Sequence, residues 1–192
     1  MENITEPVKL TVLVDASFLN FITSDFKANF ERMLNRQLEV VDLSVLFSYI
    51  IMDCGIMAGN NEIDVYLIYN QQEPELAVCS PSNVKNLHEM AFKNELGEFS
   101  FYAFSNEGFA SIDEFFLDSL VNLLDDDKVN RLAVVGFNEH YGENIDKILA
   151  DNKGTVITKF AMNSGNADNN FSTEIIAYPI MMALGISSNE LK

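Results

Sequence analysis

The sequence predicts an α/β protein with a mostly parallel sheet and helices on both faces, a three-layer, Rossmann-like sandwich. Short apolar runs rich in β-branched and aromatic residues, typical of strands, alternate along the chain with stretches of helical apolar spacing. These stretches are about ten residues or longer, enough for the crossovers that join parallel strands. With 192 residues, 48% of them apolar, and no linker, repeat or low-complexity segment, we expect one domain over residues 1–192.

The first predicted strand is the apolar run from Leu10 to Val14, which ends at a carboxylate, Asp15. Apolar side chains then recur mostly at three- and four-residue steps from Phe18 to Leu34. We therefore expect a loop or short turn after the strand, followed by a helix that ends at about Gln37.

A second helix is expected after Asp42, whose side chain can accept hydrogen bonds from the first helical turn. It ends near Gly55, which suits the left-handed position that follows many helices. The β-branched and aromatic run Ile63 to Tyr69 predicts the second strand. A turn at Gln71 to Pro74 leads to Leu76–Cys79, a candidate hairpin partner for that strand.

The middle of the chain predicts a helix, a strand and another helix. Ser82 can cap a helix that Gly97 closes, and alternating aromatic and small residues from Phe99 to Phe104 indicate the third strand. Ser111 and Glu114 match the S-x-x-E capping box, and an apolar stripe follows them. We therefore expect a buried helix from Ser111 onward.

The last third of the chain predicts two more strands, one more helix, a polar loop and an apolar helical C-terminus at about residues 171–186. The strands are Arg131–Val135 and Thr155–Phe160, the helix is Tyr141–Ala150, and the loop is Asn163–Asn170. Pro179 is expected to kink or interrupt the C-terminal helix, because proline removes a helical hydrogen bond.

The composition narrows the range of functions. The chain has 12 lysine and arginine residues against 29 aspartates and glutamates, a net charge of -17. Such a charge repels phosphate backbones, so RNA is disfavoured as a partner by bulk electrostatics. No G-x-G-x-x-G or G-x-x-x-x-G-K-[ST] loop and no G-x-S-x-G elbow occurs in the sequence, which argues against dehydrogenase, P-loop and α/β-hydrolase functions.

The cysteines and the apolar segments indicate a cytoplasmic protein. Cys54 and Cys79 are too few and too far apart for a disulfide scaffold or a zinc site, so we expect buried thiols in a reducing compartment. The N-terminus lacks the charged and apolar regions of a signal peptide. The apolar segment Ile175–Ile186 is shorter than the roughly 20 residues that cross a bilayer, so no membrane association is expected.

Asp15 is the clearest candidate for a functional site. It follows the first strand, and open α/β sheets bind ligands in the crevice at the carboxyl ends of their strands. The alternative is a structural role, because aspartate often ends a strand and accepts hydrogen bonds from nearby backbone N–H groups.

The predicted helix after Ser111 carries further acids. Asp113 and Glu114 lie in its first turn, where the helix dipole favours negative charge. Asp118 lies four residues after Glu114, so the two share a face and repel each other by about a few tenths of a kcal/mol. A bound divalent cation would offset this repulsion, and exposure to solvent would make it negligible.

Three polar residues, Asn138, Glu139 and His140, come shortly after the fourth strand. If this strand lies beside the first one, the three side chains face Asp15 and could supply ligand oxygens or a proton-transfer group. The alternative is an ordinary helix start, with Asn138 as the cap and Glu139 in the first turn.

Taken together, these motifs resemble a divergent NYN domain of the PIN-like nuclease superfamily, over roughly Leu10 to Phe160. The segment Val12–Asp15 is similar to the first-strand motif of that family, and Ile112–Asp118 is similar to its middle acidic motif. Val135–Glu139 is similar to the fourth-strand motif, with Asn138 and Glu139 at the positions of its aspartate pair.

The resemblance implies a sheet of order 3-2-1-4-5 and a ribonuclease that hydrolyses phosphodiester bonds with Mg²⁺ or Mn²⁺, which would activate a bound water. The implied metal ligands are Asp15, Asp118, Glu139 and Glu114, of which the first three would be catalytic. Asn138 and His140 would bind the substrate.

The alternative class is a catalytically degenerate Rossmann-like module for protein–protein interaction. Such a module would keep the scaffold and bind a protein through an acidic crevice or an apolar surface. A homodimer through the Phe- and Met-rich C-terminal segment is part of this alternative.

Overall fold

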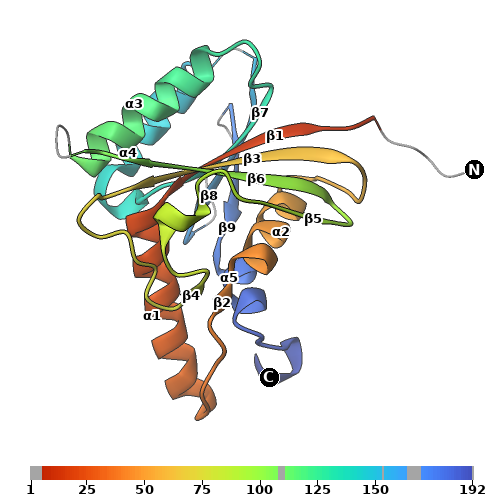
Figure 1. Cartoon of the computed structure of the whole chain (residues 1–192), viewed down its shortest axis with the longest axis vertical. Coiled ribbons are helices and arrows are strands. Elements are labelled where there is room, and N and C mark those ends of the chain that lie inside the picture. Colours follow the sequence, from red (N-terminus) through yellow and green to blue (C-terminus); the bar gives the residue numbers. More distant parts are fainter. Residues whose placement is uncertain (1–5, 108–110, 153, 164–169, 192) are drawn as a thin grey trace, which may run out of the picture.

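The computed structural model describes residues 6–107, 111–152, 154–163 and 170–191. Within these residues, seven strands form one sheet in the order β5-β6-β3-β1-β7-β8-β9 (Figure 1). The strands are β1 (Lys9–Asp15), β3 (Asn61–Tyr69), β5 (Ala91–Asn94), β6 (Gly97–Ser105), β7 (Arg131–Val135), β8 (Val156–Ala161) and β9 (Ser172–Ile175). All neighbouring strands run parallel except β5, which is antiparallel to β6. The predicted α/β class with a mostly parallel sheet is confirmed.

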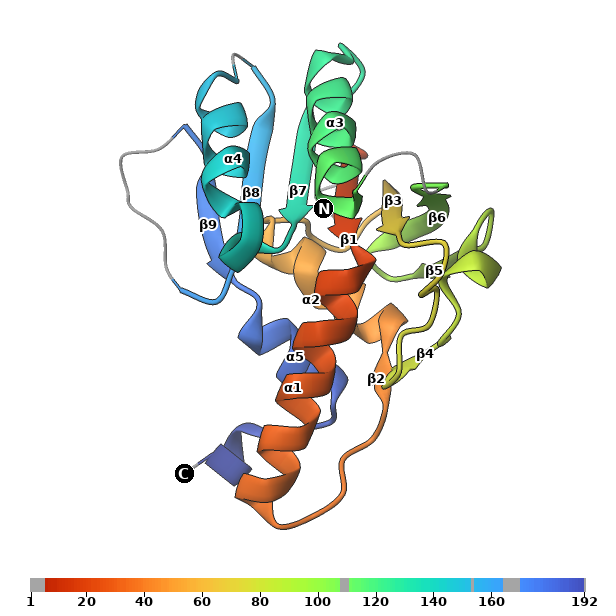
Figure 2. The same cartoon turned by 90° about the vertical axis from the view of Figure 1, so that its left-hand side faces the viewer.

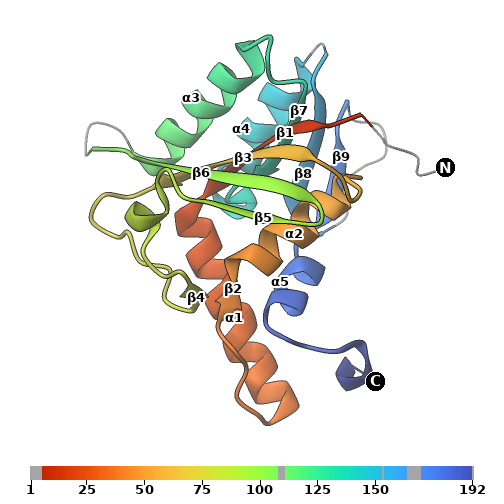
Figure 3. The same cartoon turned by 45° about the vertical axis from the view of Figure 1, so that its right-hand side comes forward.

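Helices pack on both sides of this sheet (Figures 1 and 3). They are α1 (Ala16–Leu34), α2 (Leu43–Asp53), α3 (Ile112–Asp125), α4 (Asn138–Ala150) and α5 (Ala177–Ala183), with short 3-10 turns η1 (Val84–Leu87) and η2 (Ser188–Leu191). Val12 and Val14 of β1 belong to the hydrophobic cluster of α1, α2 and α5, whereas Leu13 belongs to the cluster of α3 and α4. Successive side chains of a strand point to opposite faces, so each face of β1 has its own core.

Two aspartates start the first two helices. Asp15 caps α1, and Asp42 caps α2. Each side chain accepts hydrogen bonds from the backbone N–H groups two and three residues further along the chain. Because Asp15 is both the last residue of β1 and the cap, α1 follows the strand without the expected loop. α1 also ends at Leu34, earlier than Gln37, because Asn35 adopts the left-handed conformation with φ 49°. α2 ends at Asp53, close to Gly55, and Gly55 has the left-handed φ of +77° that the sequence predicts for it.

The segment between β3 and β6 differs most from expectation. Leu76–Cys79 is not a hairpin partner of β3, because β4 (Cys79–Ser80) pairs in parallel with β2 (Val41–Asp42) in a separate small sheet. The helix expected from Ser82 to Gly97 is replaced by η1 and by β5, which forms a hairpin with β6. Gly97 starts β6 at φ +143°, and a Cβ there would lie 2.3 Å from the carbonyl oxygen of Asn61 on β3.

The C-terminal part of the chain is less helical than predicted. Residues 172–175 form the edge strand β9, and Pro179 lies in the first turn of α5, where its missing N–H has no helical partner to lose. Ile180 and Leu184 of this segment are buried in the core beside α1 and α2, so they are not available to a dimer surface. Most of the expected loop at 163–170 lies outside the described residues.

α4 begins at Asn138, three residues earlier than expected, and is kinked at Tyr141, whose backbone is not helical. Cys54 and Cys79 are both buried and free, as predicted, and burial raises their pKa values to about 12 and about 11. In the described part of the chain, no helix has both the length and the apolar character needed to cross a membrane.

Candidate functional site

Asp15 lies at the carboxyl end of β1, as the sequence predicts, but its carboxylate is fully engaged within the protein. One oxygen, Oδ1, accepts hydrogen bonds from the backbone N–H groups of Ser17 (2.8 Å) and Phe18 (3.1 Å). The other, Oδ2, accepts a hydrogen bond of 2.5 Å from the hydroxyl of Tyr141 on α4. The side chain has 0% exposure to solvent. The geometry is that of a buried helix cap.

The titration of this pair follows from its burial. Removal from water raises the pKa of Asp15, the hydrogen bonds from Tyr141 and the two amides oppose that rise, and the charge of Asp113 adds to it. Burial, together with the neighbouring Asp15 charge, raises the pKa of Tyr141 far above its ordinary value. Tyr141 therefore stays protonated and donates to Asp15.

The other predicted metal ligands lie apart from Asp15. Glu114 and Asp118 are exposed on α3, where Glu114 completes a capping box with Ser111, and Glu139 is exposed in the first turn of α4. Across the described ranges, no three His, Cys, Asp or Glu side chains gather as a metal site requires. Glu139 and Asp118 occupy the surface positions that the structural alternatives predict for a first-turn acid and a solvated helix face.

Asp113 is the acid of α3 whose charge reaches both Asp15 and Tyr141. The sequence predicts a capping role for Asp113 in the first turn and a metal-binding role for Asp118. The helical register of α3 indicates that Asp113 faces the core. Asp113 precedes the buried Phe116 by three residues and therefore lies on the same side of the helix. Asp118 follows Phe116 by two residues and points away.

These residues do not fit the divalent cation that the resemblance implies. Mg²⁺ or Mn²⁺ would need carboxylate oxygens that are free to bind it. Both oxygens of Asp15 already accept hydrogen bonds inside the protein, and the exposed Asp118 and Glu139 belong to no cluster of three possible ligands among the residues that the structure describes.

The predicted substrate-binding residues have structural contacts instead. The side-chain amide of Asn138 donates to the backbone oxygens of Gly136 (3.2 Å) and Phe160 (2.9 Å), and so ties the end of β7 to β8. Its oxygen is buried and has no partner among the described residues. The exposed ring of His140 stacks on Phe137 at 3.7 Å between ring centres, which favours a fixed orientation at the start of α4.

A different feature stands out on the sheet itself, at one end of the face that α3 and α4 cover. The cluster under α3 and α4 takes its sheet residues from β3, β1, β7 and β8, and in the described chain no third helix continues that layer over β6 and β5 (Figures 2 and 3). We call this surface the open face and define it by the side chains of β3, β6 and β5 on the α3 side. They are Glu62, Asp64, Tyr66, Glu98, Ser100, Tyr102, Phe104 and Lys93.

Burial alternates along β3 and β6, with most residues of one face buried and most residues of the open face exposed or half-buried. In β3, Ile63 and Val65 are buried on the α1 side, whereas Glu62 is exposed and Asp64 is half-buried on the open face. Parallel strands are usually covered on both faces and apolar on both. β3 and β6 are parallel over nine register pairs, yet on the open face β6 has an exposed residue at each end, Glu98 and Phe104, and β3 is buried on that face only at Ile68. The alternating pattern is visible in the sequence from residue 61.

Aromatic rings form a ladder across the carboxyl half of the open face. Tyr66 stacks on Tyr102 at 5.3 Å and on Phe104 at 5.8 Å between ring centres. Phe104 remains 39% exposed. Beside the ladder, a hollow of about 250 Å³ lies between the sheet and α3, with apolar walls that include Ile68, Phe115 and Leu123.

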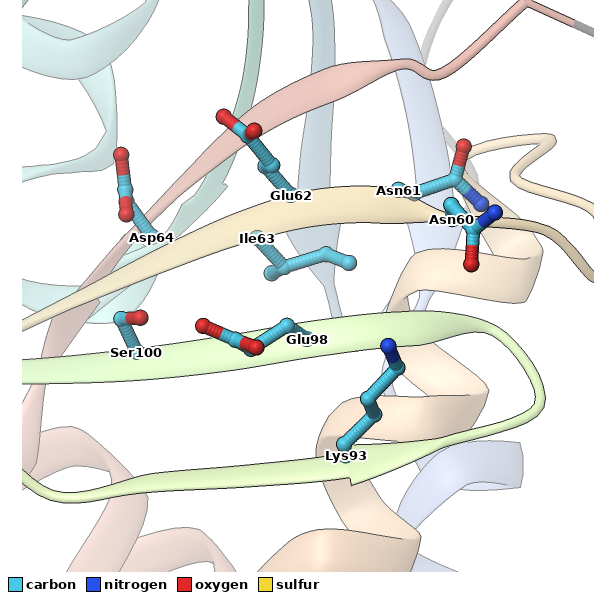
Figure 4. A pocket seen from close by; sticks show the side chains of 8 residues that line it. All are labelled: Asn60, Asn61, Glu62, Ile63, Asp64, Lys93, Glu98 and Ser100. Carbon is cyan, nitrogen blue, oxygen red and sulfur yellow. The ribbon is translucent and has the colours of Figure 1, made fainter.

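A second hollow, of about 290 Å³, lies at the amino ends of β3 and β6 and is lined by charged side chains. Figure 4 shows Glu62 and Asp64 on β3 above Glu98 and Ser100 of β6, with Lys93 on β5. Glu62 and Glu98 are register partners on neighbouring strands, so two like charges lie side by side.

The charges around the open face are mainly negative. Asp64 pairs with Lys9 at 3.2 Å between Oδ2 and Nζ, and this hydrogen bond and charge raise the pKa of Lys9. Burial raises the pKa of Tyr66, and the charges of Asp64 and Asp126 raise it further. Asp126 directly follows α3, and its negative charge adds to that of Asp64 around Tyr66.

The comparison with known proteins identifies the family but no activity. The family of unknown function DUF6621 matches residues 6–191, which is nearly the whole chain, and the chain belongs to this family. No curated protein and no solved structure matches it.

Proposed function

We propose that this chain is a non-catalytic, protein-binding module on a PIN-like, Rossmann-like scaffold, and that it binds its partner through the open face. One observation carries this proposal: β6, a parallel strand, has no helix over one face in the described chain, and the aromatic ladder of Tyr66, Tyr102 and Phe104 ends there at a Phe104 that is 39% exposed. An exposed apolar surface with a polar rim is typical of interaction sites.

The scaffold part of the proposal has its own support. The five central strands lie in the order β6-β3-β1-β7-β8, which corresponds to the 3-2-1-4-5 order expected for the resemblance. Helices on both faces of this run agree with a three-layer sandwich. The ribonuclease function stays a prediction of the resemblance, and the engaged carboxylate of Asp15 argues against it.

Site-specific photo-crosslinking in the native host tests the proposal. A benzoylphenylalanine placed at Tyr102 reports what contacts the open face, and the same probe at Tyr178 on α5 is the control. Tyr178 is 50% exposed and lies on the other side of the sheet.

We expect a discrete protein crosslink from Tyr102 that is absent from Tyr178. A crosslink to RNA, identical products from both positions, or no product from Tyr102 would each contradict the proposal.

A further inference from the structure

We propose that the partner presents a basic amphipathic α-helix, which lies beside α3 on the open face and completes the helical layer there. This inference rests on the proposed function, because it names the chemistry of the partner that the open face binds.

The dimensions of the layer leave room for one helix. Strands lie about 4.8 Å apart and packed helices about 8–10 Å apart, so one helix covers about two strands. On the α3 side, the described chain has α3 and α4 over a seven-stranded sheet, and they account for about four strands. α3 lies over β3 and β1, so the strands beyond it, β6 and β5, offer the width that one more helix occupies.

The hollow beside α3 matches the apolar stripe of a helix. Phe115 and Leu123 of α3 form one wall, and Tyr66, Ile68 and Phe104 form the floor. Leucine-sized side chains at helical spacing would fill this hollow of about 250 Å³ and bury Phe104, which is now 39% exposed.

The charges select a basic helix. Glu62 and Glu98 lie side by side at one end of the open face, and Asp126 lies near Tyr66 beyond α3. Lys93 is the register partner of Glu98 and supplies one positive charge against the two glutamates. Lysine or arginine on the partner would offset the remaining negative charge, and the net charge of -17 would draw a cationic segment to the chain.

The same charges disfavour other occupants. A second copy of the chain would bring another -17 and place like charges against each other. Single-stranded RNA can stack on exposed aromatic rings, but its phosphates require a positively charged groove, whereas the hollow at the amino ends of β3 and β6 has Glu62, Asp64 and Glu98 against one lysine, Lys93.

Designed peptides test the inference directly. The first is a fluorescent peptide of about 18 residues, long enough to match α3, with leucine at helical spacing and lysine elsewhere. The second has glutamate in place of lysine. The third contains the residues of the first in an order without an apolar face. Binding to the full chain is measured by anisotropy at roughly 0.15 M salt.

Two charge-matched variants locate the binding. Phe104→Glu places an acid in the apolar hollow, and Phe21→Glu places one at an aromatic that is 52% exposed on α1, on the other side of the sheet. We expect the lysine peptide to bind the wild type and Phe21→Glu equally, and to bind Phe104→Glu about tenfold more weakly or worse. Attraction by charge alone predicts the opposite, since each variant gains a negative charge.

The double variant Glu62→Gln/Glu98→Gln changes only exposed side chains and guards against misfolding of Phe104→Glu. We expect it to bind the lysine peptide severalfold more weakly and with a shallower salt dependence. Equal binding of the lysine peptide to Phe104→Glu, equal binding of the shuffled peptide, or no binding of the lysine peptide to wild type would overturn the inference. A Tyr102 crosslink together with no peptide binding would refute the basic helix alone, whereas loss of the crosslink would refute the proposed function.

Discussion

Substitutions of Asp15 separate a helix cap from a metal ligand. In Asp15→Asn the side-chain oxygen can still accept from the N–H groups of Ser17 and Phe18, and the new amide can donate to the hydroxyl oxygen of Tyr141. The variant exchanges charge-assisted hydrogen bonds for neutral ones and leaves the Tyr141 O–H without its acceptor, although the hydroxyl oxygen still accepts from the new amide; against these costs, the variant removes a buried charge. We expect its free energy of unfolding at neutral pH to lie within about 1 kcal/mol of wild type.

Asp15→Ala removes every one of these contacts. Loss of the cap of α1 costs about 1 kcal/mol, and the buried Tyr141 hydroxyl left without its acceptor costs about 1–3 kcal/mol more. We therefore expect a loss of about 2–4 kcal/mol. For a domain of this size that lowers Tm by about 5–15 °C.

The assay is urea unfolding of wild type and both variants, repeated in thermal melts with and without millimolar Mn²⁺. The cap interpretation requires Asp15→Asn to be much milder than Asp15→Ala and Mn²⁺ to leave all three melts unchanged. If Mn²⁺ raises the Tm of wild type but not that of Asp15→Asn, a cation binds this carboxylate and the reasoning fails.

Three further predictions follow from the same structure. An unfolded aspartate has a pKa of about 3.9 and folded Asp15 has a higher one, so between these two pKa values the folded state binds more protons than the unfolded state. Urea midpoints of wild type should fall as the pH rises through this range, and those of Asp15→Asn should fall less, because the raised pKa of Asp53 remains in the variant. Gly97→Ala places a Cβ 2.3 Å from the Asn61 oxygen at φ +143° and should cost about 3 kcal/mol or more in urea unfolding, with no loss meaning that β6 can shift away from β3. Burial raises the pKa values of Cys54 and Cys79 to about 12 and about 11, so a thiol reagent at neutral pH should react with neither until urea unfolds the chain; rapid labelling of the native protein would show that these sites open.

The parts of the fold that the sequence predicts are those specified by local chemistry. The capping box at Ser111 and the cap at Asp42 each place a helix start correctly, because the signal lies within a few residues. The helix predicted from Ser82 to Gly97 is wrong because the structure of this segment depends on a distant part of the chain. Its apolar spacing fits a helix, but Gly97 is required by the close approach of the Asn61 backbone.

In the candidate site too, the sequence predicts what local patterns specify and does not predict contacts between distant residues. The position of Asp15 at the carboxyl end of β1 is predicted by the strand alone. Its partner Tyr141 is not, because the hydrogen bond joins residues 126 positions apart and no local pattern specifies it. The choice between Asp113 and Asp118 was decidable from helical register once Phe116 was assigned to the core.

The hydrogen bond between Asp15 and Tyr141 also bears on how the molecule unfolds. Asp15 begins α1, which packs on one hydrophobic cluster, and Tyr141 belongs to the other cluster under α4. The bond therefore spans the edge of the sheet and joins the two helical layers at one point. Opening either layer alone would strand a buried carboxylate or a buried hydroxyl, each at a cost of about 1–3 kcal/mol. We therefore expect the two layers to open together, with native-state hydrogen exchange in α1 and α4 following a common opening free energy.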